Sequence, residues 1–251
     1  MVASQVSNTG LVNSYNSVSV YNILLHYIHT YRRIQLCCIA RQRYSVPAPL
    51  SLVHIDTNHK LTRYNVVIFG GIDGFSRKMF YLDTAANNKA ATVFGYFMGG
   101  VSRNGWPSRV RADQGVENVD IARCMFPVRG TGHGSFIAGK SGHNQRLLNC
   151  LWRDVWSAVT CKYYNLLYSL EEEGYLDLSN SIHLFCVGYG FLPRLRADFQ
   201  HFTESWNNHP LSTEANLTPH QLWHIGMLQT PVSVFVSFEH SIFSRRIIWK
   251  Q

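Results

Sequence analysis

The sequence predicts an α/β fold in which helices flank a mixed five-stranded sheet and a helical extension follows at the C-terminal side. Two observations carry this prediction. The first is a set of short strand-like segments at residues 51–57, 64–73, 78–82 and 108–113, of which the first and the last alternate polar and apolar residues as half-buried strands do. The second is the spacing of these strands. Short turns join the first three, as in an antiparallel meander, whereas a helical segment separates them from the fourth.

Helical segments occupy most of the remaining core. Asn87 and Asn88 can cap a helix that runs to about Ser102, and Ser141 can cap a long helix that runs through Trp156 or beyond. Between these two helices we expect a short helix and a fifth strand, at residues 117–127 and 135–138. Four further helices are expected at about 162–173, 180–190, 194–208 and 218–226. The resulting order of elements is β-β-β-α-β-α-β-α.

The 251-residue chain divides into three segments where its composition changes. Residues 1–47 form a basic N-terminal segment, partly helical or disordered, which ends in a linker marked by Pro47. Residues 48–226 form the core with its helical extension, and residues 227–251 form a C-terminal tail. We find no run of about 18 apolar residues, so we expect no membrane partner.

Histidines and cysteines in the N-terminal segment raise the question of a zinc site. The candidates are His26, His29, Cys37 and Cys38. Adjacent cysteines fit tetrahedral ligation poorly, and the spacing matches no common structural zinc pattern. We therefore expect no zinc, and we expect the six scattered cysteines to be reduced thiols.

Positive charge gathers around the fourth strand. The chain as a whole has a formal net charge of +8 and a pI near 9.3. Residues 101–153 hold eight Lys and Arg residues against three acids, whereas residues 154–209 hold three against seven. A basic region of this kind favours a polyanionic partner, and nucleic acid is the first candidate.

Two of the predicted strands each deliver an aspartate at their C-terminal end. Asp56 ends the first strand and Asp113 ends the fourth. Strands of this kind can bring both carboxylates to one edge of a sheet. Carboxylates at close range repel each other, and a divalent metal ion is the usual means of neutralising them. Asp56 and Asp113 are therefore the candidate metal ligands.

Several sequence blocks, taken in order, resemble the catalytic core of integrases of mobile-element origin, and more narrowly the integrase-core proteins of vertebrate genomes. The blocks are His54–Lys60, Gly70–Arg77, Arg111–Asn118, His143–Arg146, Leu151–Val155 and Trp206–Pro210, spread over about residues 44–226. The resemblance implies a ribonuclease-H-like fold and descent from DDE polynucleotidyl transferases, in which two Asp and one Glu hold two Mg²⁺ or Mn²⁺ ions. It assigns the two catalytic, metal-binding Asp roles to Asp56 and Asp113.

The third acid of that family is missing here. The family pattern is Asn-Gln-Arg-Ile-Glu-Arg-Leu-Trp, whereas this chain has one residue more and no Glu between Asn144 and Trp152. Counting forward from Arg146 places the Glu at Leu148, and counting back from Trp152 places it at Asn149. Helical periodicity puts Leu148 on the apolar stripe, so Asn149 is the degenerate Glu position that faces the site.

Other residues complete the expected site. Glu117, four residues after Asp113, is a candidate substitute for the missing acid; the alternative is an ordinary acid favoured by the dipole at a helix N-terminus. The candidates for DNA contact are the basic residues near the two strands, namely Lys60, Arg63, Arg109, Arg111, Arg129, Lys140, Arg146 and Arg153.

From the resemblance we expect an integrase-like core that binds DNA, with metal binding weakened and polynucleotidyl transfer weakened or lost. One alternative is an active Mg²⁺-dependent strand-transfer enzyme. A second is a protein-interaction scaffold without a nucleic-acid role, in which Trp206 and Trp223 form part of the contact surface. The resemblance also implies a nuclear location and self-association.

Overall fold

The computed structural model describes residue 22 and residues 24–28, 45–132, 134–139 and 141–230, with only the backbone described for residues 141–146. The chain divides into two units, residues 1–44 and residues 45–251. In the first unit, residues 22 and 24–28 are helical. The remainder of this unit, with three of the four zinc candidates, and the tail after residue 230 lie outside the described residues.

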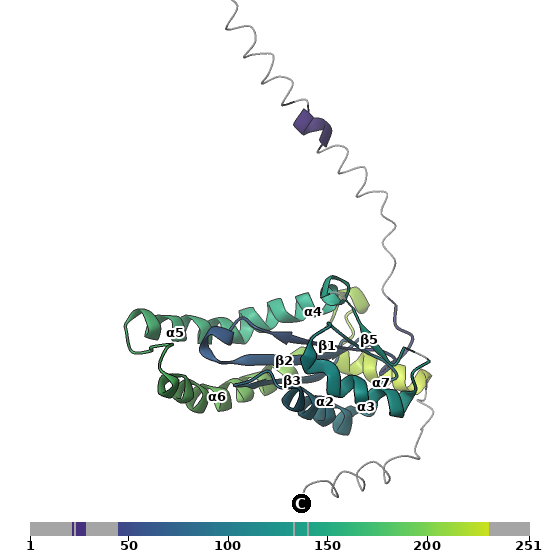
Figure 1. Ribbon diagram of the computed structural model, residues 1–251. Helices are drawn as coiled ribbons and strands as arrows, with labels where there is room; N and C mark the ends of the chain where they lie inside the picture. Colours follow the sequence, from purple (N-terminus) through teal and green to yellow (C-terminus); the bar gives the residue numbers. More distant parts are fainter. Residues whose placement is uncertain (1–21, 23, 29–44, 133, 140, 231–251) are drawn as a thin grey trace, which may run out of the picture. The chain divides into compact units, whose positions relative to one another are not determined.

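The second unit is built on a five-stranded sheet with the strand order β3-β2-β1-β4-β5. β1 (Val53–Asn58), β2 (Val67–Asp73) and β3 (Met79–Ala85) form an antiparallel meander. β4 (Val110–Ala112) and β5 (Phe136–Ala138) extend the sheet on the other side of β1 in parallel orientation. The expected mixed five-stranded sheet is confirmed, and β1 is its central strand (Figure 1).

Helices cover both faces of this sheet. α2 (Ala90–Asn104) and the pair η2 (Val116–Asn118) and α3 (Val119–Arg129) lie on one face, and α4 (Ser141–Val155) lies on the other (Figure 1). The prediction of a cap at Asn87 or Asn88 was wrong, because the N-cap of α2 is Lys89 and no side chain caps the helix there. The helix begins after Lys89, and Asn87 Oδ1 accepts hydrogen bonds from the Lys89 N–H at 3.1 Å and the Thr92 hydroxyl at 2.8 Å.

Alternation along the central strand decides which side chains face which layer. Val53 and Ile55 are buried in the core cluster that contains Val93 and Phe97 of α2. Successive side chains of a strand point to opposite faces. Leu52, His54 and Asp56 therefore face the layer that contains α4. This alternation positions the candidate site on the α4 side of the sheet.

The long helix that begins at Ser141 passes without a break into the next one. α4 is followed by a π-helical turn, η3 (Trp156–Thr160), and then by α5 (Cys161–Glu172). The prediction of separate helices at 180–190 and 194–208 was wrong, because α6 (Ser181–Asn208) is a single helix that contains Pro193. A proline removes one helical hydrogen bond, and the burial of Leu195 and Phe199 after it stabilises the continuation.

α7 (Pro219–Gln229) ends the described core, and Thr218 and Gln221 form a capping box at its N-terminus. Trp223 of this helix is buried in the cluster with Val53 and Phe97. The indole of Trp206 is partly buried and donates to the carbonyl of Arg77 at 2.9 Å. Both indoles therefore serve internal packing, and neither supports the scaffold alternative. In the described part of the chain, no helix combines the length and apolar character needed to cross a bilayer.

Candidate active site

Asp56 and Asp113 meet at the C-terminal edge of two neighbouring parallel strands. Val53 of β1 pairs with Val110 of β4, and the same offset continued along both strands places Asp113 beside Asp56. Residues at matching positions of parallel strands point to the same face. Both carboxylates therefore lie at one edge of the sheet, on the side that faces α4.

A helix residue also contacts this pair. Trp152 Nε1 on α4 donates a hydrogen bond to Asp56 Oδ2 at 2.9 Å. The indole lies over Gly70, which pairs with Asp56 across β1 and β2. A Cβ atom at Gly70 would stand only 2.7 Å from Trp152 Cη2. The glycine therefore allows the ring to approach the sheet and reach the carboxylate.

Burial governs the charge of Asp56. It raises the pKa of the Asp56 carboxyl above its ordinary value of 3.8. The hydrogen bonds from Trp152 and from the backbone of Thr57 favour the charged form and act in the opposite direction. The negative charge of Asp113 acts in the same direction as burial and raises the pKa of Asp56 further.

Asp113 is oriented by the turn that follows β4. Its Oδ1 atom accepts a hydrogen bond from Asn118 Nδ2 at 2.8 Å and one from the Gly115 N–H at 3.3 Å. Asn118 is buried where η2 meets α3. The carboxylate is thus fixed by the start of α3, whereas Asp56 is fixed by α4.

Burial distinguishes the two candidates for the third position. Leu148 is buried in the cluster beneath α4, with 1% of its surface exposed, and Asn149 is exposed. Asn149 precedes Trp152 by three residues, so the two side chains lie on adjacent parts of the helix surface. The side chain at the degenerate position is therefore an exposed amide close to the indole that binds Asp56.

Glu117 is close to Asp113 in sequence, but its carboxyl is turned back onto the backbone. The side chain is buried, and a Cβ atom at Gly115 would meet its carboxyl atoms at 2.4 Å. Among the described residues, no group of three or more His, Cys, Asp and Glu side chains is placed to hold a metal ion. The structure brings Asp56 and Asp113 together and does not add Glu117 to them.

The donor set fits a two-ion centre poorly. Two carboxylates with water can hold one Mg²⁺ or Mn²⁺ ion, because such ions keep several water ligands. One oxygen of each carboxylate already accepts a hydrogen bond from Trp152 or Asn118. The third donor would be the neutral amide of Asn149. The described residues therefore do not supply the three carboxylates that hold a pair of metal ions.

The family model described as an integrase core domain matches residues 43–234, which is most of the chain. The chain belongs to the integrase core domain family. The strand order and the position of the two aspartates agree with the ribonuclease-H-like fold that the sequence predicted. Family membership covers the whole described core from β1 to α7.

Solved structures similar to this integrase core are of retroviral proteins. The integrase catalytic core domain of HTLV-2 in complex with magnesium, in its trimeric form, is 13% identical, with a TM-score of 0.47, over 70% of this chain and 98% of that chain. Its dimeric form is also 13% identical, with a TM-score of 0.45, over 70% of this chain and 98% of that chain. The simian T-cell lymphotropic virus intasome, in complex with PP2A regulatory subunit B56 gamma, is 12% identical, with a TM-score of 0.46. The match covers 71% of this chain and 56% of that chain. No curated protein matches the chain in sequence.

Three of the basic residues predicted to contact DNA are engaged elsewhere in this integrase core. Arg129 donates to the carbonyls of Trp106 at 2.7 Å and Pro107 at 3.1 Å, and burial lowers its pKa. Arg63 forms an ion pair with Glu171 of α5. Arg153 pairs with its neighbour Asp154 at 3.2 Å.

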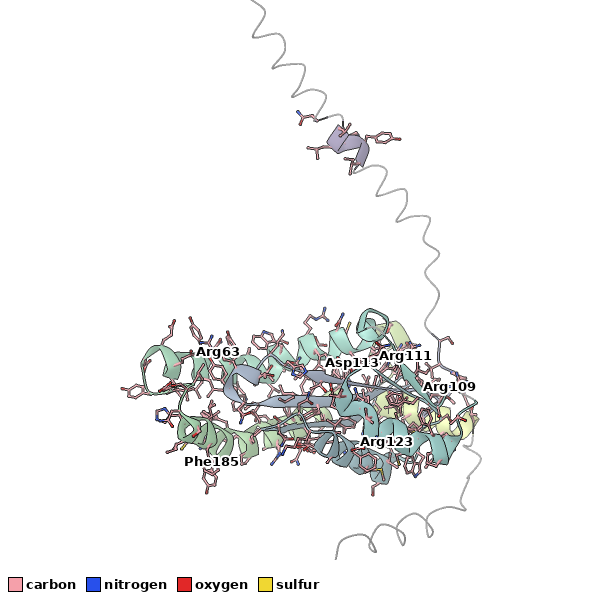
Figure 2. The ribbon with its side chains drawn as sticks, viewed as in Figure 1. Arg63, Arg109, Arg111, Asp113, Arg123 and Phe185 are labelled. Atoms are coloured by element: carbon pink, nitrogen blue, oxygen red, sulfur yellow. The ribbon has the colours of Figure 1, made fainter. Side chains whose placement is uncertain are left out.

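The other basic residues differ in their surroundings. Lys60 Nζ lies over the ring of Trp156, 4.3 Å from its centroid. Arg109 and Arg111 project from β4 and the segment before it, and Figure 2 shows them following Asp113 along one line. Lys140 and the side chain of Arg146 lie outside the described residues. Within the described part of the chain, Arg109 and Arg111 are the two candidates that make no side-chain hydrogen bond, ion pair or ring contact.

Sequence reasoning missed the hydrogen bond from Trp152. Trp152 is buried like Leu148 on the same helix, with 8% of its surface exposed. The signal that could have revealed the contact is chemical. A buried indole N–H needs an acceptor, and the carboxylate on the adjacent strand is the one available at that face.

Proposed function

We propose that this chain is an integrase core of mobile-element origin that binds DNA and whose strand-transfer activity is weakened or lost. The retained part is the fold with its two aspartates, Asp56 and Asp113, on neighbouring strands. The altered part is the third carboxylate position, where Asn149 stands. Support for the proposal comes from family membership and from the geometry of these three residues.

The exposed amide of Asn149 is the observation that carries the catalytic half of the proposal. An amide offers a metal ion one neutral carbonyl oxygen, whereas a carboxylate offers two charged ones. Asn is also one methylene shorter than Glu, so it reaches less far from the helix. Loss of one essential member of a catalytic group commonly lowers kcat by several orders of magnitude.

A nicking and strand-transfer assay with Mg²⁺ or Mn²⁺ tests this half directly. We expect the wild-type protein to show no turnover, or turnover several orders of magnitude below that of Asn149→Glu. The double variant Asn149→Glu with Asp56→Asn is the matched control, and it should lose any activity that the glutamate restores. Robust wild-type turnover that Asp56→Asn abolishes would show an active Mg²⁺-dependent enzyme and overturn the proposal.

Charge supports the DNA-binding half. The region around β4 is rich in Lys and Arg, and Arg109 and Arg111 are on the same face as Asp113. Fluorescence anisotropy with labelled duplex and single-stranded DNA is the test, measured over a series of salt concentrations. If the protein binds through phosphates, the logarithm of the binding constant should fall linearly with the logarithm of the salt concentration. Absence of binding at low salt would contradict the proposed DNA binding and favour a protein-interaction role.

Self-association and a nuclear location belong to the same proposal. The HTLV-2 core is described in dimeric and trimeric forms, which supports testing this chain for the same property. Analytical ultracentrifugation should show a species larger than 28.7 kDa at micromolar concentration. A fluorescently tagged full chain should accumulate in nuclei. A monomer in the ultracentrifuge would reject self-association, and exclusion of the tagged chain from nuclei would reject the nuclear location.

A further inference from the structure

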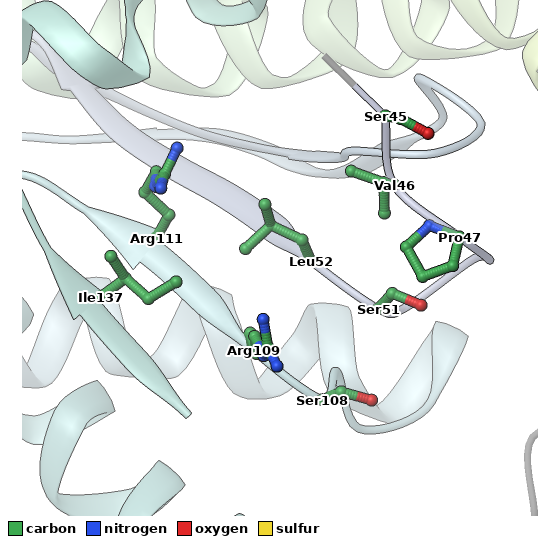
Figure 3. Close-up of a pocket in the computed structure, with 9 residues that line it drawn as sticks. All are labelled: Ser45, Val46, Pro47, Ser51, Leu52, Ser108, Arg109, Arg111 and Ile137. Atoms are coloured by element: carbon green, nitrogen blue, oxygen red, sulfur yellow. The ribbon is translucent and has the colours of Figure 1, made fainter. Parts of the chain in front are cut away.

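A cleft of about 330 Å³ lies at the end of β1 and β4 opposite to the two aspartates (Figure 3). One wall is the segment Ser45–Pro47, and Ser51 and Leu52 lead from it into β1. Ser108, Arg109, Arg111 and Ile137 supply the remainder of its lining. Among the described residues that line the cleft, none is acidic.

The two arginines of the cleft lie on one face of the sheet. They are two positions apart in an extended segment, with only Val110 between them, so their side chains point the same way. Arg109 is exposed and Arg111 is half-buried. Among the described residues, neither guanidinium has a hydrogen-bond or ion-pair partner. Figure 3 shows both side chains projecting beside Leu52 and Ile137.

Their chemistry fits a phosphate group attached to an apolar body. A guanidinium presents paired N–H donors whose geometry matches two phosphate oxygens. The hydroxyls of Ser45, Ser51 and Ser108 add donors at the rim. Leu52 and Ile137 form an apolar floor between the arginines, suited to a sugar or a base rather than to free phosphate.

The cleft lies on the same face of the sheet as the two aspartates, further back along β4. Asp113 continues the alternation of Arg109 and Arg111, so all three lie on the same face. At about 3.3 Å per residue, Arg111 is about 7 Å and Arg109 about 13 Å along the strand from Asp113. A ligand strand that passes the aspartates and follows β4 would therefore reach both guanidinium groups.

We propose that the cleft between Ser45–Pro47 and β4 binds a nucleotide unit of a nucleic-acid strand. Arg109 and Arg111 hold its phosphodiester, and Leu52 and Ile137 contact its sugar or base. The strand continues along β4 past Asp113 and Asp56. This inference rests on the proposed DNA binding and specifies where one part of the strand lies.

The test compares two double variants that change the charge equally. Arg109→Ala with Arg111→Ala removes the cleft arginines, and Arg103→Ala with Arg123→Ala removes two exposed arginines from α2 and α3 on the opposite face. Anisotropy with a short single-stranded oligonucleotide is measured against salt. We expect the cleft variant to bind on the order of 10-fold or more weakly, with the salt slope reduced by about 1 for each phosphate that the protein no longer neutralises. The α2/α3 variant should bind like wild type.

A conservative variant separates recognition from folding and from simple charge. Arg109→Lys with Arg111→Lys should keep the salt slope but bind with part of the wild-type affinity, because an ammonium cannot bind two phosphate oxygens in a fork. Circular dichroism checks that all variants fold. A dinucleotide should compete with the oligonucleotide for the wild-type protein more effectively than inorganic phosphate or a phosphoserine peptide.

The outcomes distinguish this inference from the proposed function. Oligonucleotide binding that the cleft variant retains at full strength, or that falls no further than in the α2/α3 variant, overturns the inference alone. Stronger competition by the phosphopeptide also overturns it, since the cleft would then serve a protein partner. Failure of the wild-type protein to bind any nucleic acid overturns both.

Discussion

Trp152 Nε1 donates a hydrogen bond to Asp56 Oδ2 at 2.9 Å, and this contact links α4 to the central strand at the candidate active site. Only the Oδ2 atom of Asp56 accepts this bond, so the Oδ1 atom takes no part in it. The indole ring also lies against Gly70 of β2, the residue paired with Asp56. Helix α4 thus acts on the site through an uncharged donor, whereas the position expected to supply charge, Asn149, is an exposed amide.

Replacing Trp152 with Phe keeps an aromatic ring and removes the donor. We expect the pKa of Asp56 to rise further, because the hydrogen bond stabilises the charged carboxylate. Carbon-detected NMR titration of the Asp56 carboxyl measures the change. Unfolding should become easier by about 1 kcal/mol, a typical net value for one hydrogen bond.

The matched control for that experiment is Trp206→Phe. Trp206 also donates its indole N–H, but to the backbone carbonyl of Arg77. Removing that donor should cost similar stability and leave the titration of Asp56 unchanged. An Asp56 pKa that moves equally in both variants would show that the effect is general loosening of the fold.

Asp56→Asn should stabilise the metal-free protein at neutral pH. The folded-state pKa of Asp56 is raised, so folding favours the protonated carboxyl and loses stability as pH rises through the folded-state pKa. Asn carries no such charge and still offers Trp152 an acceptor. The melting temperature of the variant should exceed that of wild type at pH 7, and the two should converge below the ordinary pKa of 3.8. A variant advantage that grows towards acid pH would contradict this sign.

Gly70→Ala should be destabilising by about 1–3 kcal/mol, the usual range for overpacking a core. The new methyl group would overlap the Trp152 ring, 2.7 Å from Cη2, and push the indole away from Asp56. Denaturant unfolding gives the free-energy change. Gly95→Ala on α2 is the control, since no atom lies within 4 Å of the added Cβ. It should instead stabilise the helix slightly.

The sequence predicted the sheet and the two aspartates well because those features depend on local alternation. Alternation along each strand decides which of its own residues share a face, and helical spacing separates Leu148 from Asn149. The parallel register of β1 and β4 then brings Asp56 and Asp113 to one face. The prediction of a break near Pro193 was wrong, because residues of α6 after the proline are buried against parts of the chain that are remote in sequence. A local pattern does not show such contacts. For the same reason the contact between Trp152 and Asp56, 96 residues apart, was not foreseen.

Charge clustering in the sequence cannot separate a cation that holds the fold together from one that is available to a ligand. Arg129 and Arg109 flank the same basic region, yet only Arg129 donates to two backbone carbonyls, those of Trp106 and Pro107. This contact anchors the end of α3 to the loop between α2 and β4. The local setting of each guanidinium, rather than the net charge of the region, therefore predicts its role.

Arg129→Ala should affect stability and leave DNA binding unchanged. Removing the guanidinium leaves the carbonyls of Trp106 and Pro107 without their donor, at a cost of about 1–3 kcal/mol in the free energy of unfolding. Denaturant unfolding measures that cost. Because the side chain is already engaged, the salt slope of oligonucleotide binding should stay at its wild-type value in conditions where the variant is folded. A shallower slope, with stability intact, would instead place Arg129 among the phosphate contacts and show that its carbonyl bonds give way to the ligand.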